Sequence, residues 1–153
     1  MGQLRFDLTI HAPREAVWDA LLGPATYRIW TAAFAEGSFY EGSWATRERI
    51  RFLSPGGKGL TSIIAENRPF EFLSIQHLGL IENGIEDTES DAVRSWAPAF
   101  ENYTLVAEVR ATRITVELEV PPDFEDFMQK TWPKALANLK ALCEPHGLAE
   151  APG

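Results

Sequence analysis

The first ten residues of the chain alternate between apolar and polar side chains. The apolar positions are Leu4, Phe6, Leu8 and Ile10. This period of two predicts a β-strand over residues 3–10 that is buried on one face only. Pro13 ends the strand and suits the first turn of a helix, so the apolar residues after it predict a short helix over 15–22. Gly23-Pro24 ends that helix, and a second short one is expected over 25–34.

Strand-like runs separated by turns fill the middle of the chain. The first four cover residues 38–40, 44–53, 60–66 and 70–78, and two more cover 103–110 and 113–120. Between the second and third runs, Ser54-Pro55-Gly56-Gly57-Lys58-Gly59 is typical of a hairpin loop. Because most of the connections are short, the strands are expected to pair antiparallel, since parallel strands need long crossovers.

Residues 79–100 interrupt this series with an acidic, glycine-containing segment that has no clear period. Loops longer than about 12–15 residues are uncommon in compact domains unless they are functional or disordered. We therefore interpret the segment as a long loop that covers a binding site, with Trp96 and Phe100 as its anchors.

The last predicted element is a long amphipathic helix over residues 122–143, in which apolar side chains recur every three or four positions. At 1.5 Å per residue it would reach about 33 Å, enough to cross a small sheet, and Pro133 is expected to kink it. The order of elements predicts an α+β fold with about six to seven antiparallel strands and the long C-terminal helix packed across the sheet.

Two stretches of the chain resemble a known superfamily. Its opening is similar to the start of the START/birch-allergen-like helix-grip (SRPBCC) superfamily, in the residues Leu8-Thr9-Ile10-His11-Ala12-Pro13-Arg14-Glu15-Ala16-Val17-Trp18-Asp19-Ala20-Leu21. Its end resembles the branch related to activators of the heat-shock-protein-90 ATPase, in Trp132-Pro133-Lys134-Ala135-Leu136-Ala137-Asn138-Leu139-Lys140. The resemblance implies a helix-grip fold, in which a curved sheet grips the long helix and leaves a space between them.

Length and charge narrow the classes of protein that fit. A chain of 153 residues predicts a single domain over residues 1–153, with a frayed tail over 145–153. The net charge of −8 argues against a nucleic-acid partner, which would require a dense basic patch. No apolar run is long enough to span a bilayer and the N-terminus lacks the features of a secretion signal, so we expect a cytoplasmic protein without membrane insertion.

Metal and cofactor sites are not expected. The chain has a single cysteine, Cys143, and its three histidines lack the spacing of a metal site. The acidic residues of the 79–100 segment do not follow the spacing of a calcium loop. No sequence pattern points to a bound cofactor.

Two residues are weak candidates for proton transfer. Residues 73, 75 and 77 alternate along one predicted strand, so the imidazole of His77 is expected on the same inner face of the sheet as Leu73 and Ile75. There it could orient a ligand or act as an acid or base. Glu48 shares the parity of Ile50, and an inward carboxylate is conceivable there. Without a nucleophile motif, these residues support an enzyme only weakly.

The aromatic content suggests a cavity instead. Five Trp and nine Phe occur in the chain, and the helix-grip resemblance would bring several of them to one interior. The side chains expected to line a ligand cavity are Trp30, Trp44, Phe52, His77, Trp96, Phe100, Phe124, Met128 and Trp132. Ligand sites are typically concave and mainly apolar.

The leading hypothesis is a noncatalytic protein that binds a small apolar or aromatic molecule, such as a lipid or another hydrophobic ligand. Two alternatives stay open. One is a protein-interaction module similar to the chaperone activators, and the other is a cyclase or hydrolase-like enzyme that uses His77. A homodimer and a protein partner are also compatible with the sequence.

Overall fold

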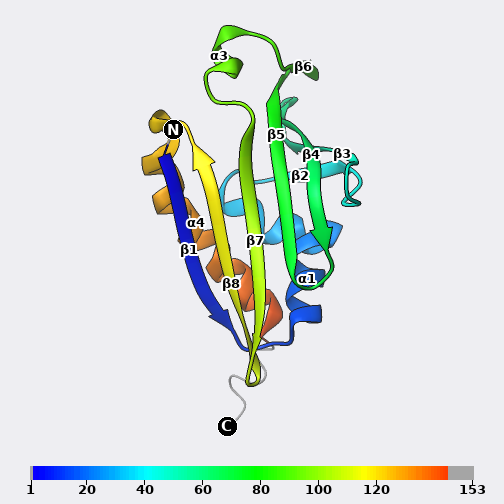
Figure 1. The fold of residues 1–153 in the computed structure, drawn as a ribbon, viewed down its shortest axis with the longest axis vertical. Coiled ribbons are helices and arrows are strands. Elements are labelled where there is room, and N and C mark those ends of the chain that lie inside the picture. Colours follow the sequence, from blue (N-terminus) through cyan, green and yellow to red (C-terminus); the bar gives the residue numbers. More distant parts are fainter. Residues whose placement is uncertain (1, 145–153) are drawn as a thin grey trace.

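An antiparallel sheet runs along the molecule, with the longer helices packed on one of its faces (Figure 1). The computed structural model describes residues 2–144. The strands are β1 (Gly2–Ile10), β2 (Phe39–Gly42), β3 (Arg49–Ser54), β4 (Lys58–Arg68), β5 (Phe72–Glu82), β6 (Ile85–Asp87), β7 (Ala99–Glu108) and β8 (Ala111–Val120). The helices are α1 (Arg14–Leu22), α2 (Pro24–Trp30), a 3₁₀ turn η1 (Thr31–Ala33), α3 (Asp91–Arg94) and α4 (Pro122–Cys143).

The sheet pairs the first strand of the chain with the last one. Its strands lie in the order β1-β8-β7-β5-β4-β3-β2, and β6 pairs with β5, which makes eight strands among residues 2–144. β1 pairs with β8 from Gly2 opposite Val120 to Ile10 opposite Thr112. This α+β architecture, with a long C-terminal helix across the sheet, confirms the predicted fold class.

α4 crosses the inner face of the sheet and buries one stripe of its surface. Its buried side chains are Thr131, Trp132, Ala135, Leu136 and Leu139. Their spacing of three and four residues places them on one side of the helix, as the hydrophobic period predicts. The helix continues through Pro133 as a single element.

The structure corrects the prediction for residues 44–53. Only Arg49–Ser54 forms a strand, and the residues before it make a turn in which Arg47 has a φ of +73°. The Arg47 amide donates to the Ile64 carbonyl oxygen at 2.7 Å, which holds the turn against β4. Glu48 therefore lies outside the strand alternation and is exposed, so it is not an inward carboxylate.

The 79–100 segment is also more ordered than predicted. β5 continues to Glu82 and turns back into β6, and Ser90 then caps α3 by accepting a hydrogen bond from the Val93 amide at 3.3 Å. Glu86 ties this extension to β3 through Arg49 at 3.3 Å and Arg51 at 2.8 Å. The segment extends the sheet at one end of the molecule (Figure 1).

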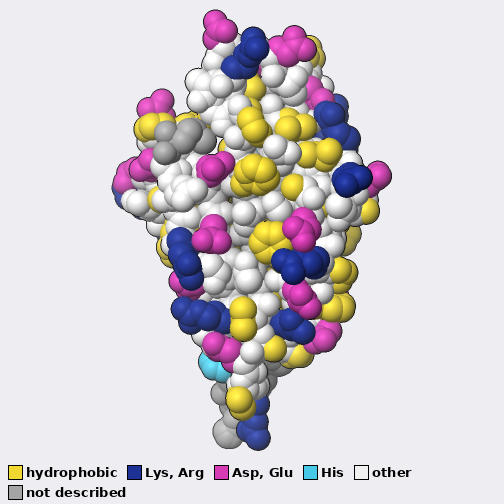
Figure 2. Space-filling view, in the orientation of Figure 1, with side chains coloured by type: hydrophobic (Ala, Val, Ile, Leu, Met, Phe, Trp, Pro, Cys, Tyr) yellow, Lys and Arg dark blue, Asp and Glu magenta, His cyan; other side chains and the backbone are white. Residues whose placement is uncertain are grey.

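The outer face of the sheet carries charges of both signs (Figure 2). Asp7 lies 3.4 Å from Arg5 and 3.8 Å from Arg113 on the neighbouring strand. Acidic and basic side chains alternate with apolar ones across this face, without a dense basic patch in the view. No helix among residues 2–144 is long and apolar enough to cross a bilayer.

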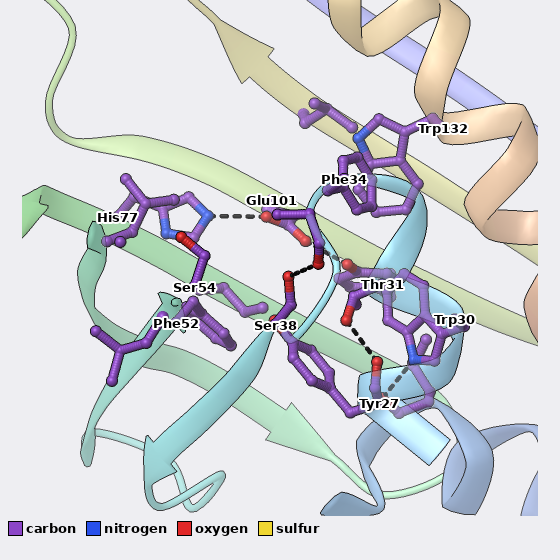
Figure 3. Close-up of a pocket in the computed structure, with 18 of the residues that line it drawn as sticks. Tyr27, Trp30, Thr31, Phe34, Ser38, Phe52, Ser54, His77, Glu101 and Trp132 are labelled. Carbon is purple, nitrogen blue, oxygen red and sulfur yellow. Dashed lines mark hydrogen bonds and ion pairs between the residues drawn. The ribbon is translucent and has the colours of Figure 1, made fainter. Parts of the chain in front are cut away.

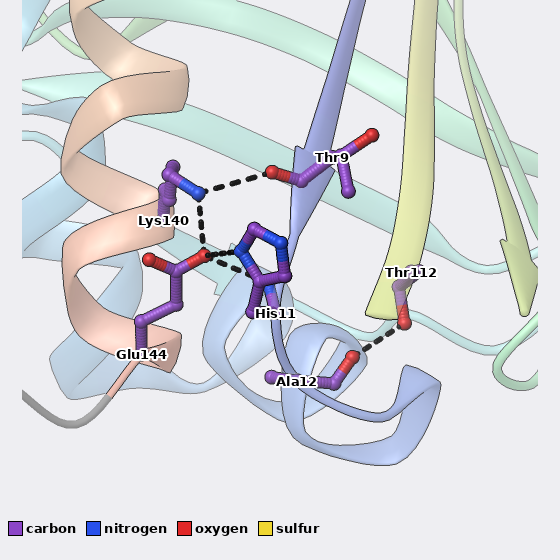
Figure 4. A network of polar contacts seen from close by, with 6 residues as sticks. All are labelled: Thr9, His11, Ala12, Thr112, Lys140 and Glu144. Atoms are coloured by element: carbon purple, nitrogen blue, oxygen red, sulfur yellow. Dashed lines mark hydrogen bonds and ion pairs between the residues drawn. The ribbon is translucent and has the colours of Figure 1, made fainter. Parts of the chain in front are cut away.

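A polar clasp holds the end of β1 against the end of α4 (Figure 4). Glu144 Oε2 accepts hydrogen bonds from the His11 backbone amide at 2.7 Å and from Lys140 Nζ at 2.5 Å, and lies 3.0 Å from His11 Nδ1. Lys140 also donates to the Thr9 carbonyl oxygen at 3.2 Å. The predicted tail 145–153 begins just after this clasp and lies outside the described residues.

The clasp predicts a pH-dependent contribution to stability. Burial would raise the pKa of Glu144, but the hydrogen bonds from His11 and Lys140 lower it on balance. A carboxyl with a lowered folded pKa stabilises the fold above its unfolded pKa of about 4.3, and this stabilisation is lost as the pH falls through the folded value. Glu144→Gln should lower the free energy of unfolding by about 1 kcal/mol at neutral pH, measured by urea denaturation.

The difference between Glu144→Gln and the wild type should shrink toward zero as the pH falls to about 3. Asp126→Asn is the matched control, because Asp126 is an exposed residue of the same helix whose ion pair with Lys130 spans 3.0 Å at the surface. An equal loss of stability in both variants, or a difference that does not depend on pH, would contradict the role of the clasp.

Candidate functional site

A cavity of about 250 Å³ lies between the inner face of the sheet and the helices α2 and α4 (Figure 3). Its aromatic lining residues are Tyr27, Trp30, Phe34, Trp44, Phe52, Tyr103, Phe127 and Trp132. They come from both layers of the fold, so the space lies between the helices and the sheet, and Phe127 at its rim is exposed to solvent. Aliphatic residues such as Leu73 and Ile75 complete the wall on β5.

The aromatic rings that line the cavity also contact one another. Trp132 contacts three of them, with centroid distances of 6.0 Å to Trp30, 5.0 Å to Phe34 and 6.0 Å to Tyr103. Tyr27 lies 5.7 Å from Trp30 and so joins this group to a second one. Edge-to-face and tilted pairs at such distances are favourable beyond the burial of area.

The second group of rings forms the opposite wall, near the β2–β3 edge of the sheet. Tyr27 lies 6.5 Å from Trp44 and 6.2 Å from Phe52. Tyr40 supports this wall by donating its hydroxyl to the Leu22 carbonyl oxygen at 2.5 Å. The indole N–H groups of Trp44 and Trp132 have no hydrogen-bond partner in the described part of the chain.

One polar network is built into this wall. His77 Nε2 lies 2.8 Å from Glu101 Oε1, and Tyr103 donates its hydroxyl to Glu101 Oε2. Because a carboxylate only accepts, His77 must carry a proton on Nε2 and donate it to Glu101. His77 Nδ1 lies 2.7 Å from Ser62 Oγ, which completes a chain of four side chains.

Strand register brings these four side chains together. Ser62 stands opposite His77 on β4, and Ile75 stands opposite Glu101 on β7. The β4–β5 ladder shifts register between Thr61 and Ser62, beside this network. Such bulges re-aim side chains and are common next to functional sites.

The electrostatics of the network keep Glu101 ionised. Burial would raise its pKa, but the hydrogen bond and the electrostatic attraction of His77, with the hydrogen bond from Tyr103, lower it below the ordinary value. Burial, followed by the charge of Glu101, raises the pKa of both Tyr103 and Tyr27. Both phenols thus stay neutral at physiological pH while the carboxylate is charged.

The structure brings most of the predicted cavity residues together. Those that line the cavity are Trp30, Trp44, Phe52, His77, Met128 and Trp132. They come from α2, the turn before β3, β3 itself, β5 and α4. The parity of His77 with Leu73 and Ile75 indicated its inward position correctly, and its side chain is 10% exposed.

Three predicted lining residues lie elsewhere. Phe100 precedes the inward Glu101, so the alternation of β7 turns it to the outer face, where it lines a separate hollow with Asn102. Trp96 follows α3 in the 79–100 segment and does not line the cavity. Phe124 is 54% exposed, one helical turn before Phe127, which takes the predicted place in the wall. The interpretation of residues 79–100 as a lid anchored by Trp96 and Phe100 is therefore wrong.

The residues that the prediction missed include the most polar part of the site. Glu101 was not identified, although it has the parity of Tyr103 and Leu105 and an extension of that alternation would have placed it inside. Tyr27 lies on α2, whose short length leaves too little period to show which face is buried. Its position becomes evident only when the helix packs on the sheet.

Metal and thiol chemistry find no support in the part of the chain that the structure describes. No group of three or more His, Cys, Asp or Glu side chains among residues 2–144 is placed to hold a metal ion. Burial, with the charge of Glu144, raises the pKa of Cys143 to about 11. The thiol is therefore protonated and a poor nucleophile at neutral pH.

Comparisons with known proteins identify the fold. No family model and no curated protein matches the sequence. A Mesorhizobium loti protein is 18% identical over 92% of this chain and 96% of its own, with a TM-score of 0.72. The Aha1 dimer from Colwellia psychrerythraea is 18% identical over 95% of this chain and 98% of its own, with a TM-score of 0.72.

CalU16 from Micromonospora echinospora is a third similar structure, at 16% identity over 96% of this chain and 79% of its own, with a TM-score of 0.65. At these identities the likeness concerns the fold alone. The chain therefore has the helix-grip fold: a curved antiparallel sheet that holds a long C-terminal helix.

The hydrogen bond from Tyr103 generates a prediction about Glu101. Tyr103→Phe keeps the ring but removes one of the two donors that lower the pKa of Glu101, so that pKa should rise. The lost hydrogen bond to a charged group should also lower the free energy of unfolding by about 1.5 kcal/mol. The titration can be followed through the ¹³C shift of the Glu101 side-chain carboxyl.

Tyr40→Phe is the matched control, because it also removes a hydrogen-bonded tyrosine hydroxyl in this wall but leaves Glu101 untouched. Its Glu101 titration should match that of the wild type. If Tyr103→Phe leaves the titration unchanged, or if both variants shift it equally, the network does not control the charge of Glu101.

Proposed function

We propose that the protein binds a small, mainly apolar or aromatic molecule in the cavity between sheet and α4. The observation that carries this proposal is the pairing of an aromatic wall with one localised polar network at the same cavity. Small-molecule sites typically combine an apolar lining with a few convergent polar groups that orient the ligand. The helix-grip resemblance of the sequence and its fold support the same function.

The size of the cavity limits the ligand. A dry cavity of roughly 150 Å³ is known to accept benzene. The volume of about 250 Å³ therefore suits one ring with a short chain better than a long lipid. Sites for drug-sized ligands begin at roughly 300 Å³. We infer that the ligand is a small one.

An enzyme that uses His77 as its acid or base is less well supported. Both ring nitrogens of His77 already have protein partners, Ser62 and Glu101. A free proton acceptor would have to be within hydrogen-bond reach of the substrate. We therefore assign His77 the role of holding Glu101 in place.

The neighbour named Aha1 was solved as a dimer, which supports a homodimer of this chain as a further proposal. Light scattering after size exclusion would test it, because a mass near twice 17.1 kDa is expected. Interaction with another protein, as a chaperone activator would require, has no specific observation in its favour.

Binding can be tested with the wild-type protein and one cavity-filling variant. Native mass spectrometry of the purified protein looks for a bound small molecule, and a titration with propylbenzene, followed by ¹H–¹⁵N NMR, supplies an uncharged probe. Met128→Trp should weaken propylbenzene binding at least tenfold, because Met128 lines the cavity and the larger ring would occupy it.

Gln129→Trp is the matched control, since Gln129 is the next residue of α4 and is exposed. It should bind propylbenzene as the wild type does. A wild-type protein that carries no small molecule and shows no shifts at the lining residues would contradict the proposed function and favour an interaction module.

A further inference from the structure

The charged groups around the cavity are unevenly distributed. Glu101 is the one carboxylate among the described residues that line it, and no lysine or arginine stands among them. The side chain of Glu101 is 21% exposed, so part of it faces the open space. A ligand in this cavity meets the carboxylate of Glu101, whose partner in the lining is the imidazole of His77, without a neighbouring lysine or arginine.

Two hydroxyl side chains of the wall, those of Thr31 and Ser38, are turned toward backbone oxygens, whereas the indole N–H groups of Trp44 and Trp132 have no partner among the described residues. Thr31 donates its hydroxyl to the Tyr27 carbonyl oxygen at 2.5 Å, and Ser38 donates to the Ala35 carbonyl oxygen at 2.5 Å (Figure 3). The hydroxyl donors of Thr31 and Ser38 are therefore not free to bind a ligand anion, and the two free indole donors carry no charge. Glu101 stands apart from them as the charged group that faces the cavity.

Glu101 retains capacity to accept further hydrogen bonds. Each carboxylate oxygen has two lone pairs. Oε1 uses one to accept from His77, and Oε2 uses one to accept from Tyr103. These two contacts fix the orientation of the carboxylate from within the sheet and leave one lone pair on each oxygen. A buried carboxylate with spare acceptors is best matched by a ligand that donates, above all by a cation.

The aromatic rings favour the same kind of ligand. Cations are attracted to the faces of Trp, Tyr and Phe rings within about 6 Å of the centroid. Phe52 packs edge-on against His77 at 5.8 Å, and Trp132 lies 6.0 Å from Tyr103, so rings border the network on both sides. The net charge of −8 would also draw cations toward the molecule.

We propose that the ligand is a small aromatic or apolar amine whose ammonium group binds Glu101 while its ring lies against the aromatic wall. This inference rests on the proposed function and adds the charge class of the ligand. It excludes fatty acids and other carboxylates as preferred ligands, because their anion would face Glu101 with no lysine or arginine in the described lining to compensate it.

Three probes of nearly equal shape and different charge test the inference. 2-Phenylethylamine is a cation at neutral pH, 3-phenylpropionate is an anion, and propylbenzene is uncharged. Dissociation constants come from NMR shifts at the residues that line the cavity. We expect 2-phenylethylamine to bind at least tenfold more tightly than propylbenzene, and 3-phenylpropionate to bind most weakly.

Glu101→Gln then isolates the carboxylate. This variant should weaken the binding of 2-phenylethylamine at least tenfold, while it changes the affinity for propylbenzene less than twofold. Glu117→Gln is the matched control, because it removes one negative charge from an exposed side chain of β8 outside the cavity lining. It should leave the order of the three probes unchanged.

The outcomes separate this inference from the proposed function. If propylbenzene or 3-phenylpropionate binds as tightly as the amine, the charge class is wrong but the cavity still binds small molecules. If none of the three probes shifts the lining residues, the proposed function fails and this inference with it. Should Glu101→Gln not fold, the order of the probes on the wild-type protein decides alone.

Discussion

The contacts of Trp132 hold the two layers of this protein together. Its indole lies on α4 and meets Phe6 on β1 at a centroid distance of 6.1 Å, besides Trp30, Phe34 and Tyr103. One side chain thus ties the C-terminal helix to the first strand, the short helices and the middle of the sheet. Trp132 is 3% exposed, so these contacts are almost fully buried.

A framework of this kind explains why a cavity can persist beside a well-packed core. Rigid rings that already contact one another cannot move into the remaining space without losing those contacts. Trp30 is further held because its Nε1 donates to the Leu21 carbonyl oxygen at 3.1 Å. The tryptophans and phenylalanines therefore both fill the core and line the cavity, and the same ring often does both.

The polar network depends on this framework. A carboxylate in an apolar interior is costly unless it is paired and hydrogen-bonded, and Glu101 meets this condition through His77 and Tyr103. Register places all three on the inner face of adjacent strands. The carboxylate is therefore ionised and oriented before any ligand arrives, which reduces the cost of binding a donor.

The sequence predicted where helices and strands lie better than it predicted which face of each element a side chain occupies. The strand 3–10 and the helix 122–143 have long periodic patterns, and both were found with nearly correct bounds. Phe100 was placed on the wrong face, because its strand was taken to begin after it and the inward Glu101 was not recognised. Phe124 and Phe127 both fit the apolar stripe of α4, and only the position of the cavity along the helix determines that Phe127 lines it and Phe124 does not.

Other features depend on tertiary contacts that no local pattern records. The turn before β3 is held by the Ile64 carbonyl, which lies on another strand, so Glu48 could not be placed from its parity alone. The short strand β6 forms because β5 extends beyond its predicted end and Glu86 reaches Arg49 and Arg51. A segment that looked like a free loop is thus part of the sheet.

A crystal structure of the protein with 2-phenylethylamine would test the central claim most directly, since it shows both the ring and the charge of the ligand. We expect the phenyl ring within the cavity beside Trp132 and the nitrogen about 2.7–2.9 Å from a Glu101 carboxylate oxygen. An amine bound only at the surface, or a ring inside with its nitrogen turned away from Glu101, would contradict this account of the site.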